Sequence, residues 1–186
     1  MKFSGHEKRI LLLLAERAII ESLVPGRKVP FISPDLPEKL RSFCGAFVSI
    51  YVDGELRGCI GTFSEEEPLY KNVKQMAVSA ACNDSRFDSI QADDLDRLSL
   101  EISVLSPRQK ISDPSEIIIG LHGIYMRHGA HRGTLLPQVA VNQNWSAIEF
   151  LSNCSKYKAG LGWDGWKTAE LYTYEALVFS SRMPSF

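Results

Sequence analysis

One hairpin constrains the fold of this chain more than any other feature. Asp53-Gly54 stands between two strand-like runs, 46–52 and 55–63. A two-residue type I′ turn needs a positive φ at both central positions, and Asp-Gly adopts it readily. Two neighbouring antiparallel strands are therefore predicted around this turn.

The rest of the chain alternates between helical and extended patterns. These patterns predict helices over 6–23, 68–82 and from Asn144 or Ser146 to about 154, a helical turn over 93–97, and strands over 98–105, 124–127, 133–136 and 170–180. Four prolines make 24–39 an irregular connector. This order of hairpins and helices predicts an α+β fold with largely antiparallel sheets flanked by helices.

Length and charge limit the number of domains and the classes of partner that this chain can have. A chain of 186 residues suits one domain, or two small lobes that share a core. Its 21 Lys+Arg against 22 Asp+Glu give a net charge of −1. Binding through nucleic-acid phosphates normally needs a positive surplus, so no nucleic-acid partner is expected.

The apolar runs are short. None approaches the roughly 18 residues of a membrane span, and the run 10–15 is shorter than the roughly 7–15 residues of a secretory signal. A cytoplasmic protein that does not enter a membrane is expected. The four cysteines show neither C-x-x-C nor zinc-ribbon spacing, which predicts reduced thiols, no metal site and no cofactor.

The densest candidate for chemistry is the segment 56–63, Leu-Arg-Gly-Cys-Ile-Gly-Thr-Phe. In a strand, Arg57 and Cys59 share one face, and a two-residue turn would place Ile50 opposite Arg57 and Val48 opposite Cys59. A guanidinium on the same face as a thiol favours the thiolate. Two glycines in a strand indicate a bulge or a close approach by backbone or ligand. Cys59 is then either a nucleophile or ligand contact, with Arg57 as anion anchor, or a buried structural cysteine.

Six ordered segments, beginning with 56–63, resemble the AMMECR domain family, whose bacterial and archaeal members are often labelled AmmeMemoRadiSam system protein A. The segments 83–87, 101–107, 120–124, 135–140 with Trp145, and 158–161 with Trp166 are similar to its D-P-R-F, E-[IV]-S-V-L-S-P, G-x-H-G-[IL], L-L-P-Q-V-A…W and K-A-G-L…W segments. Three features depart from the family pattern. Ser85 replaces the proline, Thr134 replaces a leucine, and Cys154 lies farther from Lys158 than in the family's C-x-K-A-G, which argues against a catalytic Cys154.

The resemblance implies a shape more than a reaction. It implies a single domain over 1–186 with two interleaved, unequal subdomains, the larger containing both termini, and a cleft beside the signature strand 56–63. It implies partnership with a Memo-type protein, related to non-haem-iron dioxygenases, and with a radical-SAM protein. Eukaryotic relatives are discussed as regulatory or interaction proteins.

Further candidates lie in loops. His122, in a glycine-rich turn, is either a general base for Cys59 or a residue that bonds its own loop. Asp84 and Arg86 either contact an anion or form an interlobe salt bridge. With Gln138, whose amide can donate to a ligand, the expected ligand-binding residues are Arg57, Gly58, Gly61, Thr62, Asp84, Arg86 and Gln138.

Two functions compete. The preferred one is a binding protein that takes a small ligand or a partner protein through the signature strand, because no P-loop, G-x-S-x-G or H-E-x-x-H motif occurs. The alternative is an enzyme in which Cys59 is the nucleophile or acid. Arg57 and Arg86 would then hold an anionic substrate and His122 would transfer protons.

Overall fold

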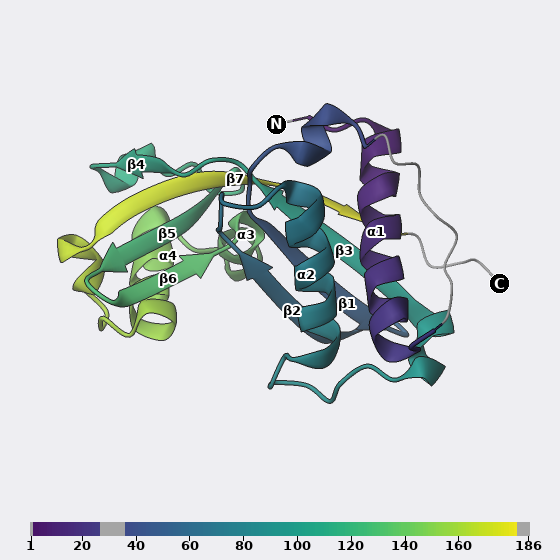
Figure 1. Cartoon of the computed structure of the whole chain (residues 1–186). Helices are drawn as coiled ribbons and strands as arrows, with labels where there is room; N and C mark the ends of the chain where they lie inside the picture. The colour runs from purple at the N-terminus through teal and green to yellow at the C-terminus, as the bar shows by residue number, and fades with distance from the viewer. Residues whose placement is uncertain (1, 27–35, 182–186) are drawn as a thin grey trace. The chain divides into compact units, whose positions relative to one another are not determined.

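The computed structural model describes residues 2–26 and 36–181, and most of the predicted connector 24–39 lies outside them (Figure 1). The chain divides into two compact units. The first comprises Met1–Leu105 with Leu177–Phe186, and the second comprises Ser106–Ala176. The predicted α+β architecture with antiparallel strands is confirmed.

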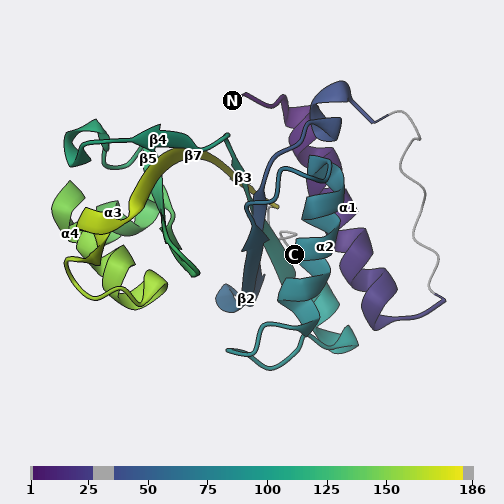
Figure 2. The same ribbon diagram turned by 60° about the vertical axis from the view of Figure 1, so that its left-hand side comes forward.

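In the first unit two helices lie side by side on one face of an antiparallel sheet, as both views show (Figures 1 and 2). The sheet order is β2-β1-β3, followed by the end of β7, so β2 is an edge strand. The elements are α1 (Gly5–Leu23), β1 (Ala46–Val52), β2 (Glu55–Thr62), α2 (Leu69–Cys82) and β3 (Leu98–Leu105), with 3-10 turns at Glu38–Arg41 and Ala92–Arg97. The predicted helices, the helical turn and these three strands are all present.

The hairpin between β1 and β2 has the predicted turn but a different register. Asp53 and Gly54 have φ values of 52° and 84°, as a type I′ turn requires. However, β2 carries one extra residue, Arg57, between the residues paired with Tyr51 and Ile50. Because this bulge shifts the pairing by one, the predicted partners were wrong: Cys59 lies opposite Ser49 rather than Val48.

The core of this unit explains the first glycine of the signature strand. Val48, Ile50 and Ile102 are fully buried beneath the helices. Gly58 faces α2 so closely that a Cβ there would overlap the carbonyl oxygen of Ala80. Glycine is therefore required at this position by the close approach of a helix backbone to the strand.

The second unit is a smaller antiparallel sheet with its own core. The strand order is β6-β5-β7, with β4 pairing on the other side of β7. Phe150, Leu151 and Met126 are almost completely buried in it. The elements are β4 (Gln109–Ile111), β5 (His122–His128), β6 (His131–Leu135), α3 (Pro137–Gln143), α4 (Ala147–Cys154) and β7 (Glu170–Ser180), with short turns at Pro114–Glu116, Ser155–Ala159 and Gly165–Thr168.

Local capping explains where several helices begin. Ser146 Oγ accepts a hydrogen bond from the Glu149 backbone N–H, and the Glu149 carboxylate accepts one from the Ser146 backbone N–H. This capping box confirms one of the two predicted caps of α4. Ser4 and Glu7 form the same arrangement at α1, a signal that the sequence analysis missed. Within residues 2–26 and 36–181, no helix is both long and apolar enough to cross a membrane.

Candidate ligand-binding site around Cys59

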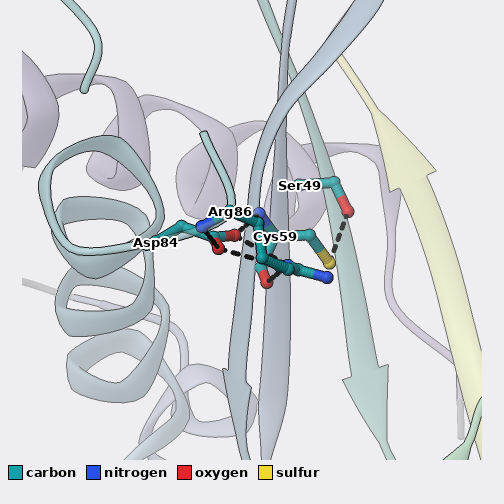
Figure 3. A network of polar contacts seen from close by, with 4 residues as sticks. All are labelled: Ser49, Cys59, Asp84 and Arg86. Atoms are coloured by element: carbon teal, nitrogen blue, oxygen red, sulfur yellow. Dashed lines mark hydrogen bonds and ion pairs between the residues drawn. The ribbon is translucent and has the colours of Figure 1, made fainter. Parts of the chain in front are cut away.

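The backbone of Cys59 is held by the loop that follows α2. The Asp84 carboxylate accepts a hydrogen bond from the Cys59 N–H at 2.8 Å, and Arg86 Nη2 donates to the Cys59 carbonyl oxygen at 2.7 Å (Figure 3). Residues of an edge strand present such groups away from the sheet, where they would otherwise be open to solvent or to another strand. We call Asp84 and Arg86 the edge brace, because together they close the edge of β2 at this residue.

The edge brace is itself tightly joined. Arg86 Nε and Nη2 donate to the two carboxylate oxygens of Asp84 at 2.8 and 2.7 Å, a side-on bidentate pair. The Asp84 side chain is only 5% exposed, whereas that of Arg86 is 59% exposed. The hydrogen bond from Arg86, which outweighs the effect of burial, holds the pKa of Asp84 well below its usual range, with help from the Cys59 N–H. Asp84 is therefore a carboxylate at neutral pH.

The thiol of Cys59 has two polar neighbours. Ser49 Oγ donates to Sγ at 3.3 Å from the adjacent strand, as Figure 3 shows. The pKa of Arg86 is raised chiefly by its bond to Asp84, and further by the charge of Cys59 and a hydrogen bond with its side chain. The strand pattern had paired the thiol with Arg57, whereas the guanidinium that the structure bonds to Cys59 is that of Arg86, through the Cys59 carbonyl oxygen.

Two more polar groups belong to the same sheet face. Burial raises the pKa of the Tyr51 hydroxyl, and the charges of Glu101 and Cys59 raise it further. Glu101 lies opposite Ser49 on β3. We call the side chains of Ser49, Tyr51, Cys59, Arg86 and Glu101 the Cys59 face. They offer hydroxyl, thiol, guanidinium and carboxylate groups on the side of the sheet opposite the helices.

The other predicted residues of the signature strand have packing roles. A Cβ on Gly61 would overlap the ring of Phe47, so the second glycine makes room for an aromatic side chain. Thr62 Oγ1 accepts a hydrogen bond from the backbone N–H of Ser64 at 3.0 Å and orders the loop after β2. With Gly58 against α2, both glycines of the signature are explained by close packing.

Asn72 is a residue that the sequence analysis missed. Its buried Nδ2 lies 3.0, 3.1 and 3.3 Å from the carbonyl oxygens of Cys44, Ser64 and Glu67. It thereby ties α2 to the segments before β1 and after β2. The available signal was a polar amide among the apolar positions of α2, because a buried amide needs partners.

The histidines of the second unit are engaged with their own backbone. His122 Nδ1 accepts a hydrogen bond from the Ile118 N–H at 3.1 Å. A neutral imidazole has a single acceptor nitrogen, so this contact uses the one that a general base would need. His128 Nδ1 and His131 Nδ1 each lie 3.0 Å from a backbone carbonyl oxygen. In the part of the chain that the structure describes, no group of three or more His, Cys, Asp and Glu side chains is placed to hold a metal ion.

Gln138 and Cys154 of the second unit were also considered in the sequence analysis, the first as a ligand contact and the second as an improbable catalytic residue. Gln138 lies in the first turn of α3, a helix that the sequence analysis did not predict. Cys154 is fully buried, and burial raises its pKa to about 12. A thiol in that state is a poor nucleophile, in keeping with the doubt that its spacing raised.

The fold and the site define an α+β protein of two units whose signature strand is braced at a cysteine. The AMMECR1 family model matches residues 12–179. Protein MK0488 of Methanopyrus kandleri is 39% identical over 98% of this chain and 92% of its own length. Protein NEQ441 of Nanoarchaeum equitans is 38% identical over 88% of this chain and 94% of its own.

A solved structure agrees with these relatives. The crystal structure of the uncharacterised protein PH0010 from Pyrococcus horikoshii superposes with a TM-score of 0.87 at 32% identity, covering 99% of this chain and 96% of that one. The chain belongs to the AMMECR1 family, which confirms the family predicted from its sequence.

Proposed function

We propose that this chain is a binding protein and that the Cys59 face takes a small polar ligand or a polar segment of a partner protein. The edge brace carries this proposal. It fixes the backbone of Cys59 on a strand, and preorganised groups on a rigid element are what a binding site requires. The groups presented are the donors of Arg86 and Ser49, the thiol of Cys59 and the carboxylate of Glu101, so the ligand offers both hydrogen-bond acceptors and donors.

The chemistry of the brace favours binding over proton transfer. The depressed pKa of Asp84 keeps it ionised, and the guanidinium of Arg86 stays charged at every physiological pH. Neither group bonded to Cys59 therefore exchanges a proton near neutral pH, as a general acid or base must. Both instead supply fixed charge and fixed geometry.

A second candidate rests on the Arg86 guanidinium that is bonded to the backbone of Cys59. A cysteine can act as a nucleophile, and a guanidinium held close to it can bind an anionic group of a substrate. In that case Cys59 attacks an electrophilic substrate and Arg86 binds an anionic group of it. Arg57, on the same strand as Cys59, is a second candidate anion contact in this case.

Partners and compartment are proposed on the family resemblance alone. In this proposal the protein acts in the cytoplasm together with a Memo-type protein and a radical-SAM protein, and the Cys59 face is the surface used. The absence of a positive charge surplus supports a protein or small-molecule partner rather than a nucleic acid.

Alkylation of the native protein tests both candidates. We would measure the rate at which iodoacetamide modifies each cysteine, using half-buried Cys82 as the internal comparison. The binding proposal predicts that Cys59 is modified while the protein remains folded, and that its alkylation leaves the circular dichroism unchanged. A Cys59 that reacts only after denaturation would overturn it.

The enzyme candidate makes a further demand. Because this candidate needs an anion-binding Arg86, the ratio of the iodoacetate to the iodoacetamide alkylation rate should be higher at Cys59 than at Cys82. Arg86→Gln should abolish this difference. Arg86→Lys, which keeps the charge, should retain part of it. An equal reagent preference at both cysteines in the native protein would leave binding as the function.

A further inference from the structure

An apolar groove lies between α1 and the end of β7, on residues that take no part in the Cys59 face. Its volume is about 400 Å³. It is lined by Gly5, Lys8, Arg9, Leu12 and Leu13 of α1 and by Phe179, Ser180 and Ser181. All of these residues belong to the first unit.

The groove arises because α1 has more apolar residues than the core can use. Leu11, Ala15 and Ile19 form its fully buried face. The continuous run 10–15 extends around the helix, so Leu12 is only half-buried at the side of that face, and Leu13 is 43% exposed. With Phe179 they make a contiguous apolar floor, which is a more informative feature than a single exposed leucine.

The rim of the groove is positive. Lys8 Nζ lies over the ring of Phe179, 5.8 Å from its centroid, in a cation–π contact. In the described part of the chain, neither Lys8 nor Arg9 forms an ion pair with a carboxylate. The adjacent Glu7 is bonded to the backbone and hydroxyl of Ser4. Two cations are therefore available beside an apolar surface.

We propose that this groove binds a small amphipathic carboxylate, such as a medium-chain fatty acid. The alkyl chain would lie on Leu12, Leu13 and Phe179, and the carboxylate would face Lys8 and Arg9. The volume of the groove lies at the lower end of the roughly 300–1,000 Å³ of small-molecule pockets. A groove lined by eight residues is also smaller than the roughly 20–30 residues that each partner contributes to a specific protein interface. Charge complementarity selects the anionic head group.

Isothermal titration with decanoate, kept below its micelle concentration, tests the site. We expect saturable binding of one decanoate per chain and weaker binding of decanol, which has the same alkyl chain and no charge. Lys8→Glu/Arg9→Glu should lower decanoate affinity about tenfold, equivalent to roughly 1.4 kcal/mol. Arg41→Glu, an exposed charge reversal in the same unit but outside the groove, should leave it unchanged.

The apolar floor is tested separately. Leu13→Ser should weaken both ligands, and Ile118→Ser, at an exposed position outside the groove lining, should weaken neither. The proposal is overturned if decanoate does not bind, or if decanol binds equally well and the variants change nothing. It is also overturned if only a chain shortened to end at Ser181 binds decanoate, because the groove would then be covered by residues 182–186.

Discussion

Two carboxylate–guanidinium pairs, one in each unit, are built from the same groups but hold different things. Asp84 and Arg86 are bonded to each other and to the backbone of Cys59, with the carboxylate nearly buried. Glu170 and Arg127 face each other across β7 and β5, with 39% and 51% of their side chains exposed. The first pair fixes the backbone of an edge strand. The second lies on the surface of a sheet whose strands are already joined by backbone hydrogen bonds.

This difference shows that the surroundings of an ion pair decide how much it contributes to the stability of the fold. The pKa of Glu170 is lowered by Arg127 first and by Lys110 second, yet water screens a pair this exposed. Asp84 is shielded and satisfies a backbone N–H that has no strand partner. Removing Asp84 therefore disturbs the backbone of the signature strand, while removing Glu170 disturbs only side chains.

The largest effect should come from the position that brings α2 onto the braced strand. Gly58→Ala places a Cβ on the Ala80 carbonyl, so the helix must shift, and we expect a loss of about 3 kcal/mol in unfolding free energy. Gly5→Ala is the matched control, because nothing lies within 4 Å of its Cβ. Urea unfolding of both variants decides this, and equal stability would mean that α2 does not pack as described.

The brace comparison itself predicts the next effect. Asp84→Ala leaves the Cys59 N–H without its acceptor and should cost about 2 kcal/mol. Glu170→Ala should change the thermal midpoint little, because its partners are solvated. Thermal unfolding of the two variants tests this expectation. A larger loss of thermal midpoint in Glu170→Ala than in Asp84→Ala would contradict it.

Acid should weaken the first pair selectively. Because the pKa of Asp84 is lower in the folded than in the unfolded protein, its contribution is complete above the unfolded value of about 3.9 and is lost as the pH falls below it. The stability difference between wild type and Asp84→Asn should thus be constant from pH 7 to about 5 and shrink below about pH 4. Midpoints measured from pH 2.5 to 7 test this; a difference that grows in acid would contradict it.

The smallest effect is expected at Arg57. It is the extra residue of the bulge, and the guanidinium bonded to Cys59 is that of Arg86. Arg57→Ala should therefore leave both stability and the alkylation rate of Cys59 close to wild type. A slowing as large as that of Arg86→Gln would return Arg57 to the site.

The sequence predicted what is set locally. The Asp53-Gly54 turn follows from backbone preference at two residues, and the cap at Ser146 follows from a four-residue pattern. Helix α3 was missed although Pro137 at its first position is a common start.

Three residues of the candidate site stood out in the sequence, but their contacts did not. Cys59, Asp84 and Arg86 were all singled out, yet the target of the brace is the backbone of Cys59, which no side-chain pattern encodes. Ser49 was missed because one extra residue in β2 changes every partner beyond it. The pairing of strands and the position of a bulge are set by contacts between distant parts of the chain, which the sequence of one strand does not contain.

The most direct test of the edge brace is amide hydrogen exchange at Cys59. Its amide lies on the free side of an edge strand, where exchange should be fast unless Asp84 holds it. We predict strong protection in the wild type and its loss in Asp84→Ala. The amide of Ile60, which faces Val48 on β1, should stay protected in both. Equal exchange of the Cys59 amide in the two proteins would contradict the account.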